Sequence, residues 1–230
     1  MAEAGDVVIN ELMPDPVPSV GNPPNALPDR QYIELYNRTN LPINLQGWTL
    51  IAGNSTEVLP AYELAADSFV MITKDEGVPE FPPGLPMLGL DMSSVALTNS
   101  GNSVSLLSPE GILISTVSYT DAWYRDANKE DGGWSLEQID PHNLCGGKAN
   151  WQASVDANGG TPGHQNSVFG LNPDTTAPRL VRAALPGDSL IMVFFSEALS
   201  DELIFQPGNY RLVPPLPIDS VSVPLSRDRV

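Results

Sequence analysis

The chain has 230 residues, with 28 acidic and 11 basic side chains, which give a formal net charge of −17 at neutral pH. This acidity argues against DNA and RNA as ligands, because contacts with phosphates need Lys and Arg. It disfavours anionic membrane surfaces for the same reason. No apolar stretch approaches the roughly 20 residues of a membrane-spanning helix, and the best run covers only residues 190–195.

The charge is unevenly distributed along the chain. Residues 1–170 carry 21 acidic and 6 basic side chains, a net −15, whereas residues 171–230 carry 7 and 5, a net −2. All four tryptophans also lie in the first part. Together with the length, this asymmetry predicts two units.

The sequence gives no indication of a signal peptide or of an internal disulfide. Residues 1–6 contain no apolar signal-peptide segment, so secretion would require a signal peptide in a longer reading frame. Cys145 is the only cysteine, and it therefore has no partner for an internal disulfide.

The first 170 residues show the periodicity of short β-strands. The predicted strands cover residues 7–13, 32–37, 48–52, 69–73, 103–107, 112–119 and 134–139. In the first of them, alternation places Val7 and Ile9 on one face and Leu12 on the other. The even spacing is typical of a β-sandwich or barrel. The best helical window, residues 200–205, lies in the second part and is barely a turn and a half long.

Pro- and Gly-rich segments separate these strands. Residues 14–28 contain six prolines and predict a long, stiff connection, and residues 81–86 resemble them. Residues 101–102 and 109–111 predict hairpin turns, the second of which joins 103–107 to 112–119.

A polar linker, residues 169–178, separates a first domain, residues 5–168, from a second segment, residues 179–230. The second segment contains four further strand-like stretches, which cover residues 179–185, 190–196, 210–213 and 218–223.

Motifs of the first domain follow a recognisable order. They are Val8-Ile9-Asn10-Glu11, Tyr32-Ile33-Glu34-Leu35-Tyr36-Asn37, Ile43-Asn44-Leu45-Gln46-Gly47-Trp48-Thr49-Leu50, Trp134-Ser135-Leu136-Glu137, Asn150-Trp151 and Gly159-Gly160-Thr161-Pro162-Gly163. This order resembles a bacterial lamin tail domain. The resemblance implies an all-β fold, an immunoglobulin-like β-sandwich, in which the motif residues are structural. Those residues are Asn10, Glu11, Glu34, Asn37, Gly47, Trp48, Trp134, Trp151, Pro162 and Gly163.

The motifs also have a direct physical interpretation. Gly47 suits a turn that leads into a strand whose Trp48 fills the core. Asn37 ends a strand, where its side chain can start an Asx-type turn. Thr161-Pro162-Gly163 is typical of a β-turn with Pro second and Gly third.

The second segment resembles the start of a bacterial immunoglobulin-like domain. The segments that carry this resemblance are Thr176-Ala177-Pro178, Val193-Phe194-Phe195-Ser196-Glu197 and Asn209-Tyr210. Such domains need about 100 residues and seven strands, so we expect a partial domain here. Its open strand edge would be partly disordered or would pair with another chain.

An acidic loop is the first candidate binding site. Asp126, Asn128, Glu130 and Asp131 offer oxygen ligands at nearly alternate positions, as calcium loops do, although an EF-hand would place Gly at Asp131. The alternative is a solvated acidic loop without a metal. Zinc is disfavoured, because the chain has only two histidines and one cysteine.

Four acidic residues flank the proline-rich segment, namely Glu11, Asp15, Asp29 and Glu34. They could gather at one end of the sandwich. We favour the alternative in which Glu11 and Glu34 point outward from their strands and bond neighbouring backbone.

Two adjacent aromatic residues form a third candidate. Neighbouring residues of a strand point to opposite faces, so Trp123 or Tyr124 could be exposed and stack on a sugar ring. The alternative is that both are loop aromatics that cap the end of the sandwich.

Catalytic motifs do not emerge. The sequence has no Gly-x-Ser-x-Gly elbow and no phosphate-binding glycine loop, so we expect no catalytic residue and no enzyme activity. The first hypothesis is a non-catalytic, secreted or cell-surface module of a larger multidomain bacterial protein, for adhesion or for spacing or presenting other domains. Its partners would be other domains of the same polypeptide or surface proteins.

The second hypothesis is an accessory module that binds calcium or carbohydrate beside a secreted hydrolase. Calcium is the only candidate cofactor. The lamin resemblance does not extend to nuclear or chromatin roles, because the sequence has no coiled-coil heptads and no basic face.

Overall fold

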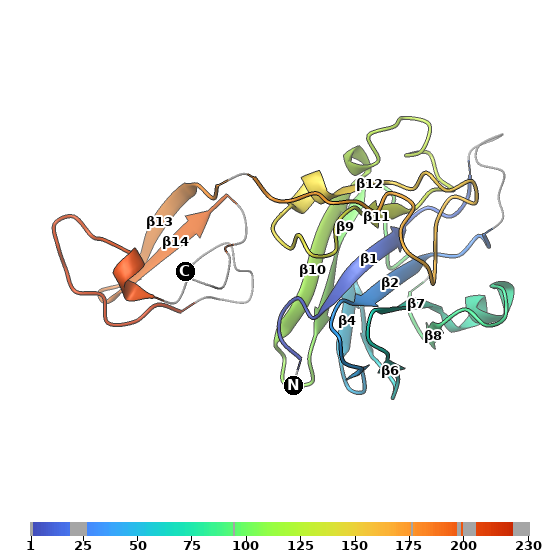
Figure 1. Cartoon of the computed structure of the whole chain (residues 1–230), viewed down its shortest axis with the longest axis horizontal. Coiled ribbons are helices and arrows are strands. Elements are labelled where there is room, and N and C mark those ends of the chain that lie inside the picture. The colour runs from blue at the N-terminus through green and yellow to red at the C-terminus, as the bar shows by residue number, and fades with distance from the viewer. Residues whose placement is uncertain are drawn as a thin grey trace. The chain divides into compact units, whose positions relative to one another are not determined.

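The computed structural model describes residues 2–18, 27–93, 95–175, 177–196, 199 and 206–222. The chain forms two compact units (Figure 1). Unit 1 comprises residues 1–143 and 148–172, and unit 2 comprises residues 144–147 and 173–230.

The regular secondary structure of unit 1 is mostly β-strand. The strands are β1 (Val7–Met13), β2 (Tyr32–Asn37), β3 (Ile43–Asn44), β4 (Thr49–Ala52), β5 (Ser55–Val58), β6 (Glu63–Leu64), β7 (Ser68–Lys74), β8 (Met87–Leu90), β9 (Gly101–Leu107), β10 (Leu113–Thr120), β11 (Leu136–Gln138) and β12 (Trp151–Ala153). Short 3₁₀ turns complete the unit, namely η1 (Asp75–Glu80), η2 (Asp121–Trp123) and η3 (Gly147–Asn150). The all-β prediction is confirmed.

Two main sheets pack face to face as an immunoglobulin-like β-sandwich (Figure 1). One has six strands in the order β12-β11-β1-β2-β7-β8, and the other has four in the order β10-β9-β4-β5. β3 and β6 form a separate two-stranded pair. The β7–β8 pair is parallel, whereas the pairs around β1 and β2 are antiparallel.

The core lies between the two sheets. Trp48, Trp134 and Trp151 are all buried in it, together with alternate aliphatic residues of the strands. Because side chains alternate along a strand, the inner face of the six-stranded sheet takes Ile33 and Leu35 from β2.

A β-bulge in β1 corrects one sequence prediction. The register between β1 and β2 shifts between Ile9 and Glu11, so Asn10 is the extra residue. Leu12 therefore lies in the same core cluster as Ile9, and its predicted place on the opposite face is wrong. The bulge turns Glu11 and Met13 to the outer face instead.

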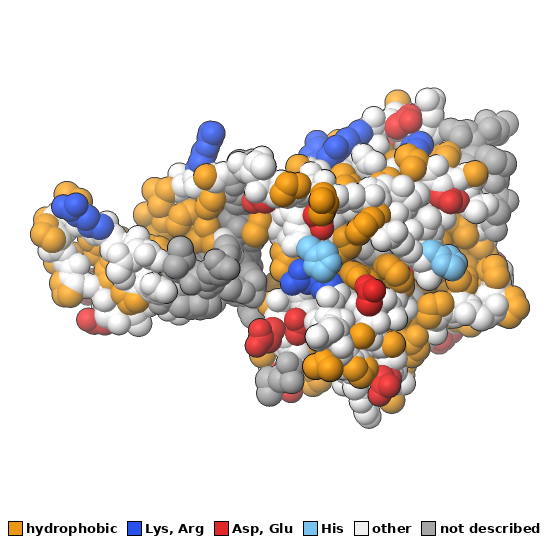
Figure 2. All heavy atoms as spheres, in the orientation of Figure 1, with side chains coloured by type: hydrophobic (Ala, Val, Ile, Leu, Met, Phe, Trp, Pro, Cys, Tyr) orange, Lys and Arg blue, Asp and Glu red, His pale blue; other side chains and the backbone are white. Residues whose placement is uncertain are grey.

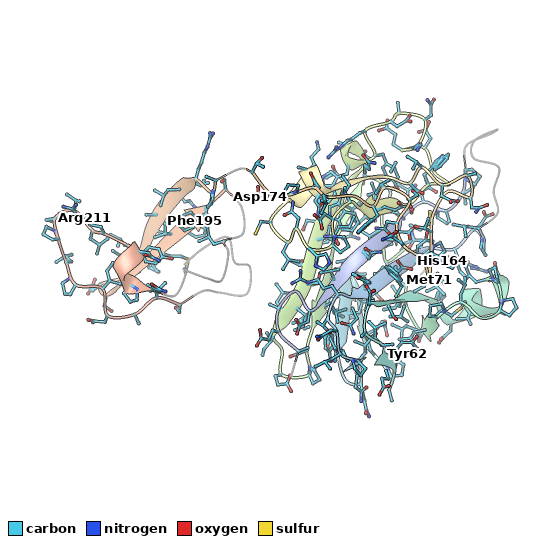
Figure 3. All side chains as sticks on the ribbon, in the orientation of Figure 1. Tyr62, Met71, His164, Asp174, Phe195 and Arg211 are labelled. Atoms are coloured by element: carbon cyan, nitrogen blue, oxygen red, sulfur yellow. The ribbon has the colours of Figure 1, made fainter. Side chains whose placement is uncertain are left out.

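The outer face of the six-stranded sheet is also covered. Residues 159–168, here called the strap, lie against it, since N–H groups of the strap donate to side chains of β1 and β2. Figure 3 labels His164 of the strap and Met71 of β7. A second apolar cluster there contains Met13, Tyr32, Met71 and Phe81. Both faces of β1 and β2 are consequently buried.

The two predicted hairpin turns differ in outcome. Gly111 N donates to Ser108 O at 2.9 Å with a φ of +79°, so the turn between β9 and β10 is confirmed. Gly101 and Asn102, in contrast, belong to β9, and the turn precedes them, where Gly101 N donates to Thr98 O.

Unit 2 contains one antiparallel hairpin, β13 (Leu180–Gly187) and β14 (Leu190–Phe195), and the turn η4 (Pro207–Asn209). Residues 210–213 and 218–222 form no strand, so those two predictions fail within the described part of the chain. Val223 and the helical window 200–205 lie outside the described residues. In the described residues of either unit, no helix has the length and hydropathy to cross a membrane.

Candidate functional site

The acidic loop follows η2 and is solvent-exposed. Its Asp126 accepts a hydrogen bond from Asn128 N at 2.9 Å through Oδ1, and its carbonyl accepts from Lys129 N and Glu130 N. Asp126 thus caps its own turn. Nowhere among the described residues do three or more His, Cys, Asp or Glu side chains converge as a metal ion would require. Calcium at this loop stays a prediction.

A lysine occupies the middle of the same loop. Lys129 Nζ lies 4.3 Å from the centre of the Trp134 ring and donates to Ser154 O. The side chain thereby anchors the loop to the sandwich by a cation–π contact and a hydrogen bond. Its positive charge also offsets part of the negative charge that would attract a cation to the loop.

The two adjacent aromatic residues have different environments. Tyr124 is buried in the core, and its hydroxyl donates to Trp134 O at 3.1 Å. Trp123 is half-buried, with its ring centroid 6.1 Å from that of Trp151. Of the two rings, only that of Trp123 reaches the surface, and a sugar site at this pair stays a prediction.

Three glutamates meet on the outer face of the six-stranded sheet. Glu11 on β1 stands opposite Glu34 on β2 and Glu137 on β11 in the antiparallel registers. All three are fully buried. We call Glu11, Glu34 and Glu137 the three-glutamate cluster.

The strap supplies most hydrogen-bond donors to this cluster. Thr161 N donates to Glu11 Oε1 at 2.8 Å, and Gly163 N donates to Glu34 Oε2. Thr161 Oγ1 lies 3.2 Å from Glu11 Oε2 and 3.1 Å from Glu137 Oε1.

The far end of the strap also binds Glu137. Ser167 Oγ and Val168 N both reach Glu137 Oε2, at 2.8 and 3.1 Å. Asn166 donates to Asn10 O and to Gln138 O, which ties the strap to the bulge in β1.

The sheet contributes two further donors. Tyr32 Oη donates to Glu11 Oε1 at 2.7 Å, and Asn10 Nδ2 donates to Glu34 Oε1 at 3.0 Å. Burial, followed by the charge of Glu137, raises the pKa of Glu11 to about 7. Burial, followed by the charge of Glu11, also raises the pKa of Glu34 well above its usual range.

Glu11 and Glu34 do point to the outer face of their sheet, as expected, but the strap covers that face and both side chains are fully buried. Both do bond backbone N–H groups, but those of the distant strap rather than of neighbouring strands. Asp15 and Asp29 lie apart from them and line a cavity of about 180 Å³. The sequence alone does not identify Glu137 as a third member of this group. Its strand, Leu-Glu-Gln, nevertheless resembles Ile-Glu-Leu of β2 in placing a buried glutamate within a buried strand.

The remaining motif residues serve the fold elsewhere. Asn37 is fully buried, and its Nδ2 donates to Leu41 O, Leu64 O and Ala65 O while its Oδ1 accepts from Thr39 N. This is the Asx-type arrangement expected at the end of β2.

The turn before β4 has the expected geometry. Gly47 adopts a φ of +79°, a region that glycine enters without strain, and leads directly to buried Trp48. Pro162 is buried in the strap, and Gly163 has a φ of +80°.

A groove of about 510 Å³ lies beside this turn. Its lining includes Thr39, Asn44, Gln46, Trp48 and Glu110. Amide and carboxylate groups therefore border this depression, while the Trp48 ring is buried in the core.

The hairpin of unit 2 is the most apolar exposed surface in the described residues of that unit. Its exposed large apolar side chains are Leu180, Val181, Leu185, Leu190 and Ile191. Hydrophobic side chains gather over β13 and β14 in Figure 2, and Phe195 marks the end of β14 in Figure 3. Since this sheet has two strands in the part of unit 2 that the structure describes, each of them has one edge without a partner strand there.

Comparison with known proteins gives one family. A sequence model of the lamin tail domain matches residues 1–121, which is more than half of the chain. No curated protein matches the chain. The match ends before β11, β12 and the strap, although the structure places all three in unit 1.

Proposed function

The chain belongs to the lamin tail domain family, and on that premise we propose that it is a non-catalytic interaction module of a larger multidomain bacterial protein. The module would be secreted or carried on the cell surface, where it adheres to partners or spaces and presents other domains. The observation that carries the proposal is the β13–β14 hairpin, with its exposed apolar side chains and open edges.

A two-stranded hairpin alone is marginal in water, and exposed apolar strands commonly mark an interface. Unit 2 also carries a net charge of only about −2, so charge repulsion opposes its association much less than that of unit 1. We infer that β13 or β14 pairs with a strand of a neighbouring domain or surface protein.

Site-specific photo-crosslinking in the source cells tests this proposal. A photoreactive residue at Leu185, which is 76% exposed on the hairpin, is compared with one at Val95, which is 68% exposed on unit 1. We expect a discrete crosslinked product from Leu185 alone, identified by mass spectrometry as an adjoining domain or an envelope or secreted protein. Equal products from both positions, or none from Leu185, would contradict the proposal.

Cell fractionation tests the location separately. We expect the full-length protein in the culture medium or on the cell surface, accessible to an added protease. Recovery in the cytosol alone would contradict the location without affecting the crosslinking result.

The second candidate is an accessory module that binds calcium or carbohydrate beside a secreted hydrolase. The 510 Å³ groove favours carbohydrate, because its amide and carboxylate groups can hydrogen-bond the hydroxyls of sugars. A glycan array with the wild type, Gln46→Ala and a control, Gln165→Ala, tests it. Binding that only Gln46→Ala removes would support the groove.

Calcium is tested by isothermal titration of the whole chain. Heat that disappears in Asp126→Ala and persists in Asp91→Ala, a change at an exposed acid outside the loop, would support the loop. No heat and no glycan binding would leave only the interaction module.

A further inference from the structure

The three-glutamate cluster carries no obvious counter-charge. The groups that act on the pKa of Glu11 and Glu34 are carboxyls, hydroxyls, an amide and backbone N–H groups, with no Lys or Arg among them. Three ionised carboxylates in such a place would combine the cost of burial with mutual repulsion. The cluster therefore has to be stabilised either by its donors or by retained protons.

The single hydrogen of the Thr161 hydroxyl cannot be donated to both of the carboxylates beside it. Thr161 Oγ1 is within hydrogen-bond distance of both Glu11 Oε2 and Glu137 Oε1, but a hydroxyl has one hydrogen. If it donates to Glu137, a proton on Glu11 Oε2 can donate to the hydroxyl oxygen. The two carboxyls and Thr161 then form one hydrogen-bonded chain that needs a single extra proton.

A second polar group points into the same place. Ser135 is fully buried. It lies beside Glu11, where it lowers the pKa of that carboxyl. A Cβ added to Gly160 would lie 2.8 Å from Glu11 Oε1 and 3.1 Å from Ser135 Oγ. The backbone of the strap at Gly160 therefore packs directly against Glu11 and Ser135.

We propose that the three-glutamate cluster is a proton-binding site, in which a proton on Glu11, linked by hydrogen bonds through Thr161 to Glu137, holds the strap closed over the sheet. When the proton leaves, contact with water would stabilise the ionised carboxylates. Water reaches them only if the strap moves away from the sheet. Closure of the strap is thus linked to proton uptake, and mild alkali loosens it.

The titratable groups that face the cluster agree with this direction. From β2 they are Glu34 and Tyr32, and from β11 it is Glu137. His164 of the strap is exposed and is not among the groups that act on Glu11. The phenol of Tyr32 has a pKa raised well above its ordinary value by burial and by Glu11, so it stays protonated as a donor.

Amide hydrogen exchange of the whole chain between pH 5 and 8 tests the proposal. The reporting amides are those of Thr161, Gly163 and Val168, and the reference is Leu59, whose N–H donates to Trp48 O. After correction for intrinsic exchange, we expect strap protection to fall by up to tenfold per pH unit up to about pH 7, and by more than the protection of Leu59. Strap protection that does not change with pH would overturn the proposal.

Glu11→Gln supplies the matched variant. The amide keeps an acceptor for Tyr32 and Thr161 N and gives Thr161 Oγ1 a permanent donor, so it mimics the protonated state. We expect a flatter pH dependence in Glu11→Gln and the wild-type dependence in the control Glu63→Gln, a change at an exposed acid of β6. An unchanged slope in Glu11→Gln would also overturn the proposal.

Infrared spectroscopy of the wild type keeps the test independent of variant folding. A buried protonated carboxyl has a carbonyl stretch well separated from that of carboxylates. We expect this band at pH 6 and a decrease in its intensity on the same pH scale as strap protection, since buried Glu34 contributes to the band as well. Absence of the band at pH 6 would contradict a proton on Glu11, whatever the fate of the variants.

Discussion

Glu11 and Glu137 stand opposite each other in the antiparallel pairing of β1 and β11, and both are fully buried. Directly opposed like charges destabilise a sheet. The Thr161 hydroxyl within hydrogen-bond distance of both is what makes the pair compatible with the fold. Stability, pH and the position of the strap are therefore linked at this pair.

The stability of unit 1 should fall as the pH rises through neutrality. The pKa of Glu11 is about 7 in the folded chain against an ordinary 4.5, so the folded state retains a proton that the unfolded state releases. This contribution is fully present below about pH 4.5 and is lost as the pH rises through 7. The difference corresponds to roughly 3 kcal/mol.

Glu11→Gln should consequently be more stable than the wild type at pH 8 and similar to it at pH 4.5. Urea unfolding followed by tryptophan fluorescence reports unit 1, because all four tryptophans lie there. Glu63→Gln, at an exposed acid, should match the wild type at both pH values. A loss of stability in Glu11→Gln at pH 8 would contradict the expected direction.

Gly160→Ala should destabilise unit 1 by about 1–3 kcal/mol, the usual cost of overpacking. The new Cβ would lie 2.3 Å from Tyr32 Oη, closer than atoms of this kind approach. Gly170→Ala is the control, because its Cβ would meet no atom closer than 3.9 Å. Thermal unfolding of both variants measures the difference, and equal midpoints would show that the strap yields without cost.

The bounds of β1 and β2 could be predicted from sequence to the residue. Both strands are short runs that end where local chemistry stops a strand. β1 ends before Pro14, and β2 ends at Asn37, whose side chain forms an Asx turn. Local chemistry sets these ends, so a local pattern reveals them.

The three-glutamate cluster could not be predicted in the same way. The bulge at Asn10 changes which face Glu11 occupies, and the donor that covers it, Thr161, is 150 residues away in the chain. A carboxylate on a strand is normally solvated, so only a non-local cover reverses the expectation. The short strands β3 and β6 were missed for a related reason, since two residues carry no periodicity.

Asn37→Asp should cost unit 1 about 2–5 kcal/mol. The side-chain amide donates into three backbone carbonyls, at 2.8 Å to Leu41, 3.1 Å to Leu64 and 2.9 Å to Ala65. A carboxylate would place a buried charge among these acceptors with nothing to donate.

Asn44→Asp is the matched control for this change. Asn44 is exposed, and its side chain accepts a hydrogen bond from Gln46 N at 3.0 Å, which Asp retains. Urea unfolding of the two variants at pH 7 should separate them clearly. Similar midpoints would show that the donors of Asn37 contribute little to the fold.

Trp123→Ala should destabilise unit 1 by about 1–2 kcal/mol, less than the 3–5 expected for Trp151→Ala. Trp123 is half-buried and packs at 6.1 Å against Trp151, whereas Trp151 belongs to the core itself. Circular dichroism during heating follows both variants without relying on tryptophan emission. Unchanged stability in Trp123→Ala would mean that the ring contributes little to packing, and it would then be free to stack on a sugar, as the accessory-module hypothesis requires.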